Sequence, residues 1–199
     1  MIRSALNTLL LLLTAGCHAQ SPDPSAHVYL ASIPFSEYDS NILSYAGQAY
    51  EGATLDEVWD ATSRDTEAFL ASIPDDSLHT AYARGKWTVA QVLQHIISYE
   101  FIMAESALMI AGKAPQPLRY QRYTQRSTAA GTVGKSREDL LREFRAARAY
   151  SREVLASLSE SEQRIVGRHE VFRTSARVLA LCISGHQAHH FGVIRERYL

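Results

Sequence analysis

The chain has 199 residues, a length typical of one domain with a short additional segment. Its apolar share of 46% is enough for a hydrophobic core, and its net charge of −1 argues against a large electrostatic field that would attract nucleic acid or an acidic surface. Glycine and proline are sparse outside a few connections, which favours helices over a β protein with many turns.

Residues 1–19 have the pattern of an export signal rather than of a folded segment. Arg3 supplies a short positive region, and residues 9–13 form an apolar run that is too short for a stable membrane span. Two processing sites compete. The stretch Leu13-Thr14-Ala15-Gly16-Cys17 resembles a bacterial lipobox, although Thr14 is a poor match, and cleavage after Ala19 is the alternative. We therefore expect an exported protein, either periplasmic or anchored to a membrane as a lipoprotein through Cys17.

The segment that follows the signal, residues 20–33, is rich in serine, proline and alanine and predicts a flexible tether. Residues 34–199 then form the folded domain. Cys182 is its only cysteine, so an internal disulfide is excluded even in an oxidising compartment.

Four segments of the domain combine helix-start signals with apolar residues at helical spacing. Two begin with capping boxes, at Thr54-Leu55-Asp56-Glu57 and at Thr88-Val89-Ala90-Gln91. The predicted helices cover residues 54–73, 88–111, 136–158 and 175–198. Their number and length predict an all-α protein, a four-helix bundle.

The connection between the second and third helices, residues 113–135, is long for a compact domain and is typical of a crossover or a functional loop. It carries Arg119, Tyr120 and Arg122 among other basic and aromatic residues. Such a strip can bind a nucleic-acid backbone, but the near-zero net charge favours a solvated crossover loop. A roof over a substrate cavity is a further interpretation.

The sequence Gly185-His186-Gln187-Ala188-His189-His190 is the strongest functional signal. His186 and His190 lie one helical turn apart on the inward face of the last helix, and His95 lies on the inward face of the second. A buried imidazole is costly unless its nitrogens are satisfied. A metal site explains three such residues together better than separately satisfied core histidines do. Three imidazole ligands would leave coordination positions open, as in catalytic metal sites.

Nearby residues have weaker claims. The helical direction of His189 differs from that of the pair by most of a quadrant, and a surface or supporting position is favoured over a fourth ligand. Cys182 fits a small buried residue better than a thiolate ligand. Glu100 is expected on a solvated face, and Trp87 in the core. Glu100 and His189 are nevertheless the candidates within the sequence neighbourhood for a general base.

These residues together resemble the DinB-like family of bacterial four-helix-bundle proteins. The resemblance runs from about residue 34 to the end and rests on five blocks: Tyr82-Ala83-Arg84-Gly85-Lys86-Trp87-Thr88, Val92-Leu93-Gln94-His95-Ile96-Ile97, Glu100, the histidine block 185–190 and Ile194-Arg195-Glu196-Arg197-Tyr198-Leu199. It implies an up-down-down-up bundle, with the long crossover between helices two and three. It also implies a divalent metal held by one histidine of the second helix and two of the last, which by position are His95, His186 and His190.

Two positions depart from the family pattern. Ser98 stands where many members have Asp, and Val193 stands where several have Gln, which removes polar partners that those residues supply. The family includes thiol-dependent S-transferases, a thiol-dependent isomerase and metal hydrolases. An exported member is separated from the cytosolic thiols that the transferases use.

The first functional hypothesis is a metal-dependent enzyme of the cell envelope, a hydrolase or a thiol S-transferase that uses Zn²⁺, or Ni²⁺, on a small molecule. The second is a non-catalytic bundle that binds a metal or a small ligand. The third is a structural lipoprotein whose histidines are satisfied core groups. No nucleic-acid partner is expected, a membrane is contacted only through a lipidated Cys17, and a homodimer is compatible with the sequence.

Overall fold

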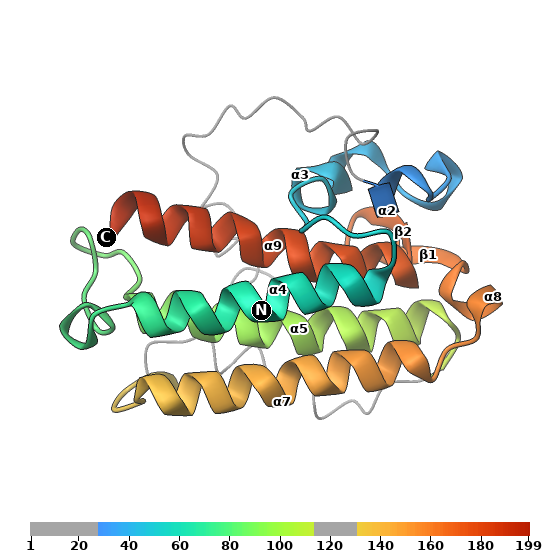
Figure 1. Ribbon diagram of the computed structural model, residues 1–199. Helices are drawn as coiled ribbons and strands as arrows, with labels where there is room; N and C mark the ends of the chain where they lie inside the picture. The colour runs from blue at the N-terminus through green and yellow to red at the C-terminus, as the bar shows by residue number, and fades with distance from the viewer. Residues whose placement is uncertain (1–27, 114–130) are drawn as a thin grey trace, which may run out of the picture.

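The computed structural model describes residues 28–113 and 131–199. Four long helices form a bundle (Figure 1): α4 (Leu55–Ser72), α5 (Val89–Ile110), α7 (Arg137–Ala156) and α9 (Ala176–Arg197). Helices α4 and α9 run in one direction and α5 and α7 in the other (Figure 1), which confirms the predicted up-down-down-up order. Each helix lies within two residues of its predicted ends.

Local chemistry accounts for these helix ends. Thr54, Thr88 and Ser136 are N-caps whose side chains accept a hydrogen bond from the third backbone amide of the helix. The predicted capping box is complete at Thr88, whereas at Thr54 the carboxylate of Glu57 accepts from the amide of Ala53 instead. Helix α5 ends where Gly112 adopts a φ of 77°, in the left-handed region. The amide of Lys113 then donates to the carbonyl of Leu108 at 2.8 Å, which satisfies one of the last carbonyls of the helix.

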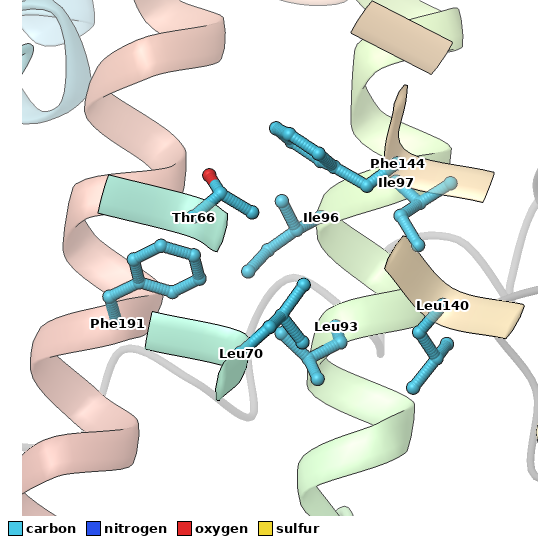
Figure 2. A pocket seen from close by; sticks show the side chains of 8 residues that line it. All are labelled: Thr66, Leu70, Leu93, Ile96, Ile97, Leu140, Phe144 and Phe191. Atoms are coloured by element: carbon cyan, nitrogen blue, oxygen red, sulfur yellow. The ribbon is translucent and has the colours of Figure 1, made fainter. Parts of the chain in front are cut away.

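The four helices bury their apolar faces against one another. Helix α5 packs against both α7 and α9, and α4 packs mainly against α9. A small apolar cavity of ≈ 10 Å³ lies between side chains of all four helices, such as Thr66, Ile96, Leu140 and Phe191 (Figure 2). A space of this size is at the lower limit for a single water, so it is a packing defect rather than a substrate chamber.

Residues 28–50 form an additional layer, which we call the N-terminal cap. It contains α2 (Val28–Ala31), η2 (Phe35–Glu37), η3 (Ser40–Ile42) and α3 (Leu43–Ala46). Helix α3 packs on α9, and Figure 1 shows the cap in blue beside that helix. Leu30 and Ile33 are buried in the core, so the end of the predicted tether belongs to the folded domain instead. The predicted export signal and residues 20–27 lie outside the described residues.

The connections hold further short elements that the sequence did not indicate. They are η4 (Asp75–Ser77), α8 (Glu160–Gln163) and a two-stranded antiparallel hairpin of β1 (Val166–His169) and β2 (Phe172–Ser175). The hairpin leads directly into α9, and Glu170 in its turn has a φ of 51°. It is a minor addition to a helical fold. Most of the predicted crossover, residues 114–130 with Arg119, Tyr120 and Arg122, lies outside the described residues.

Within the two described ranges, every helix is too short or too polar to cross a membrane.

Candidate metal centre

The three predicted ligands meet in the interior of the bundle. Helix α5 carries His95 and α9 carries His186 and His190, and the packing of these two helices brings the rings together. The Nε2 atom of His186 lies 3.1 Å from Nε2 of His95 and 3.0 Å from Nε2 of His190. One nitrogen from each ring lies within 4.8 Å of the others, so the predicted convergence of the three side chains is confirmed.

Burial keeps these imidazoles neutral. Loss of water lowers the pKa of His95 to about 4, and burial lowers the pKa of His186 well below its usual range, with a smaller effect from the neighbouring histidines. The pKa of His190 is lowered in the same way, first by burial. A neutral imidazole offers one lone pair, which is the form that binds a metal.

The three Nε2 atoms suit coordination of a cation better than hydrogen bonding among themselves. The Nε2 atom of His186 faces two other Nε2 atoms, and a neutral ring nitrogen has either a proton or a lone pair, so it pairs well with one of them at most. The Nδ1 atoms of His186 and His190 are buried and lack a hydrogen-bond partner among the described residues. If Nε2 is the ligand atom, the proton resides on Nδ1.

The spacing also suits a first-row metal. Nitrogen ligands at ~2.0–2.1 Å in a tetrahedral site stand ~3.3–3.4 Å apart. The Nε2 separations of 3.1 Å and 3.0 Å around His186 are close to this spacing. Three imidazoles are a borderline donor set that Zn²⁺ and Ni²⁺ both accept. The residues present therefore fit a single divalent ion.

Aromatic rings surround the three histidines. Tyr99, one turn after His95, stacks on His186 with ring centroids 3.7 Å apart and an angle of 12°. The ring centroid of Trp87 lies 5.2 Å from that of His95, so Trp87 adjoins the metal centre. Tyr45 of the N-terminal cap meets His186 edge-on at 5.2 Å. Burial raises the pKa of Tyr99 well above 10 and also raises that of Tyr45, so both remain neutral phenols.

The sequence analysis placed Trp87 in the core and did not identify Tyr99 or Tyr45 as neighbours of the histidines. Tyr99 follows His95 by four residues and therefore shares its face, a signal that can identify a neighbour of the centre. Tyr45 lies in a segment without a helical pattern. No local signal relates it to a histidine about 140 residues further along the chain.

The two weaker ligand candidates stay outside the convergent set. His189 is half-buried, with its ring 5.2 Å from His190 and 5.8 Å from Tyr45. Cys182 is buried, and burial raises the pKa of its thiol to about 12, so it remains protonated. The set of donor atoms that converge comprises only His95, His186 and His190 among the described residues.

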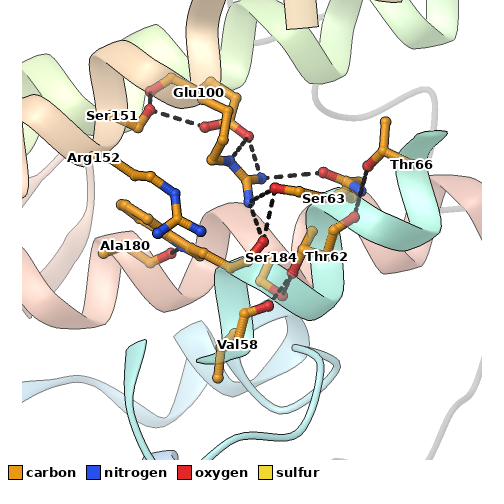
Figure 3. A network of polar contacts seen from close by, with 12 residues as sticks. Val58, Thr62, Ser63, Thr66, Glu100, Ser151, Arg152, Ala180 and Ser184 are labelled. Atoms are coloured by element: carbon orange, nitrogen blue, oxygen red, sulfur yellow. Dashed lines mark hydrogen bonds and ion pairs between the residues drawn. The ribbon is translucent and has the colours of Figure 1, made fainter. Parts of the chain in front are cut away.

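The expectation that Glu100 lies on a solvated face is wrong. Its side chain is 1% exposed, because its carboxylate pairs with the guanidinium of Arg148 in the interior. Arg148 Nε donates to Glu100 Oε1 at 2.9 Å, and Ser151 Oγ donates to Oε2 at 2.9 Å. Figure 3 shows the polar network around this pair, which also reaches the carbonyl of Trp59 and the side chain of Gln187. Both carboxylate oxygens of this general-base candidate are therefore engaged in the core.

Comparisons with known proteins agree with this architecture. Curated proteins give no match. Among solved structures, one match is described as "YfiT from Bacillus subtilis is a probable metal-dependent hydrolase with an unusual four-helix bundle topology". It is 18% identical, has a TM-score of 0.52, and the match covers 75% of this chain and 90% of that one, which supports the shared fold. The family model of the DinB superfamily matches residues 59–194, more than half of the chain. The protein therefore belongs to the DinB superfamily.

Proposed function

We propose that the protein binds one divalent metal ion through His95, His186 and His190. The observation that carries this proposal is the convergence of three neutral imidazoles, with His186 and His190 buried and His95 half-buried, whose Nε2 atoms face one another. The description of YfiT as a probable metal-dependent hydrolase supports it, since that protein has the same fold. Zn²⁺ is our first choice of ion and Ni²⁺ the second.

We further propose that the centre is catalytic, as a hydrolase or a thiol S-transferase acting on a small molecule. A divalent ion held by three ligands would lower the pKa of a water or thiol that binds beside it, giving a nucleophile near neutral pH. The protein supplies the dry surroundings that keep the histidines neutral, and Tyr99 holds the ring of His186 by stacking. His189, half-buried beside His190, is the better placed of the two general-base candidates because Glu100 is paired in the core.

Metal analysis of purified protein tests this proposal. After chelation and reloading with Zn²⁺, the wild-type protein should hold one ion per chain, whereas His95→Ala, His186→Ala and His190→Ala should each lose most of it. His79→Ala is the matched control, because His79 is an exposed histidine that contacts Lys135 rather than the cluster. Undiminished metal content in the cluster variants would refute the ligand assignment and favour the satisfied-core interpretation.

Activity separates an enzyme from a binding module. Metal-loaded protein is screened against ester, amide and thiol-acceptor panels, with His190→Ala measured in parallel. Turnover that is lost in His190→Ala supports catalysis. Equal activity in both proteins indicates a contaminant, and full metal binding without any turnover favours the binding-module alternative.

We propose a cell-envelope location on the basis of the signal in residues 1–19. If Cys17 is lipidated, Cys17→Ser should move the protein from the membrane fraction to the soluble envelope fraction. A wild-type protein that is already soluble and begins at Gln20 would instead indicate cleavage after Ala19.

A further inference from the structure

Gly185, which precedes the first histidine of the C-terminal block, lies where α3 crosses α9. A Cβ atom on Gly185 would lie 1.7 Å from the carbonyl oxygen of Tyr45 and 3.1 Å from the amide nitrogen of Ala49. Real side chains do not tolerate the shorter distance, so the absence of a side chain at Gly185 is what allows the backbone of α3 to rest on α9. The crossing is next to His186 in the sequence.

Polar contacts fix the N-terminal cap on both sides of this crossing. On one side, the amide of Arg173 donates to Asp39 Oδ2 at 2.8 Å, and Arg177 Nε donates to the buried carboxylate of Glu37 at 2.7 Å. On the other side, the amide of Tyr50 donates to Ser184 Oγ at 3.1 Å. The cap is therefore tied to β2 and α9 on both sides of Tyr45 along the chain.

The ring of Tyr45 covers two histidines of the C-terminal block. It meets His186 at 5.2 Å and His189 at 5.8 Å between ring centroids, at angles of 69° and 77°. Tyr45 is half-buried, whereas His186 is buried beneath it. The cap, residues 28–50, precedes the part of the chain that matches the DinB superfamily, residues 59–194. This wall is thus supplied by a segment outside the family-matched region.

We propose that Tyr45, seated by the contact between α3 and Gly185, is a wall of the metal centre that limits the size of the ligands reaching the open coordination positions. The inference rests on the proposed metal binding and assigns Tyr45 as a specificity-determining residue. A rigid ring beside a metal ligand excludes bulky groups by steric hindrance and leaves room for small ones. Steric discrimination of this kind changes the relative affinity for two ligands by about ten-fold or more.

Ligand access to Co²⁺-loaded protein tests the size limit through the visible absorption of the ion. Azide, imidazole and 4-phenylimidazole are titrated into wild type, Tyr45→Ala, Tyr45→Phe and Gly185→Ala. In Tyr45→Ala, 4-phenylimidazole should bind about ten-fold more tightly while azide is little changed. Gly185→Ala forces α3 away from α9 and should also increase the affinity for 4-phenylimidazole, because it moves Tyr45 with the cap. Tyr45→Phe keeps the ring and should match wild type. Should Tyr45→Ala fail to fold, Tyr45→Leu replaces it, because leucine keeps apolar volume without a flat ring.

A second readout does not depend on the metal. Diethyl pyrocarbonate modifies exposed neutral imidazoles, and peptide mass spectrometry locates the products in metal-free protein. His189 should react faster in Tyr45→Ala than in wild type, while the exposed His79 reacts at the same rate in both.

The outcomes separate this inference from the proposed function. Wild-type protein that fails to bind Co²⁺ would refute the metal centre, and the reactivity of His189 would still decide whether Tyr45 covers it. Binding of Co²⁺ with unchanged access in Tyr45→Ala and Gly185→Ala would overturn the assignment of Tyr45 alone. Equal gains for azide and 4-phenylimidazole in Tyr45→Ala would also overturn it, because a general loosening of the cap does not discriminate by size.

Discussion

Substitution of Glu100 by leucine tests whether this carboxylate is structural or catalytic. The side chain of Glu100 is 1% exposed and that of its partner Arg148 is 5% exposed. Removing the carboxylate would leave the guanidinium of Arg148 buried without a counter-charge, although it still donates to the carbonyl of Trp59 at 3.2 Å and to Gln187 at 3.3 Å. We therefore expect Glu100→Leu to be strongly destabilising.

Breaking a buried ion pair by removing one partner costs about 3–5 kcal/mol of unfolding free energy. For a chain of this length, each kcal/mol changes Tm by roughly 2–4 °C, so the expected decrease is roughly 6–20 °C. The double variant Glu100→Leu/Arg148→Met should be more stable than Glu100→Leu, because it removes the unpaired charge. It leaves the partners of Arg148 unsatisfied, at about 1–3 kcal/mol for each buried group.

Urea and thermal unfolding of the metal-free proteins measure these differences, and the metal content of Glu100→Leu should stay at the wild-type value. A loss of less than about 1 kcal/mol in Glu100→Leu would refute the view of Glu100 as a structural ion-pair partner. A Glu100→Leu variant that kept its stability but lost metal-dependent turnover would also refute the structural role, since the carboxylate would then act in the chemistry.

Three further outcomes are expected. Because burial lowers the pKa of His95 from 6.5 to about 4, the unfolded chain binds a proton between these values that the folded metal-free protein does not. The stabilisation of the folded state by neutral His95 is thus fully present above pH 6.5 and is lost as pH falls through this window, by up to about 3 kcal/mol. His186 and His190 act in the same direction. Equal urea midpoints at pH 7 and pH 5 would contradict this expectation. Zn²⁺ at about 1,000 times its Kd should stabilise the folded protein by about 4 kcal/mol, an effect that a chelator reverses and that His186→Ala lacks. Phe191 is buried and stacks on Phe69 at 4.2 Å, so Phe191→Ala should lose about 3–5 kcal/mol in urea unfolding, and a loss below about 1 kcal/mol would show that this part of the core collapses around the gap.

The sequence by itself determined the four long helices, because the signals that set them are local. Capping side chains act within three residues, and an apolar face repeats within two turns, so both can be seen without knowing what packs opposite. The same periodicity placed His95, His186 and His190 on inward faces. Their meeting at one point required only that α5 and α9 be neighbours, which the resemblance to the DinB-like family implied and the structure confirmed.

The tertiary structure alone decided which other groups surround the centre. Glu100 lies one helical turn from the buried residues Ile96 and Ala104, and only its charge suggested a solvated face. It is buried because Arg148, 48 residues later, neutralises it from the facing helix. Tyr45 lies in α3, a helix of four residues that is too short to show an apolar periodicity, and it reaches His186 because Gly185 lets one backbone rest on another. Charge pairing and close backbone approach depend on partners far away along the chain, and no pattern within a few residues specifies them.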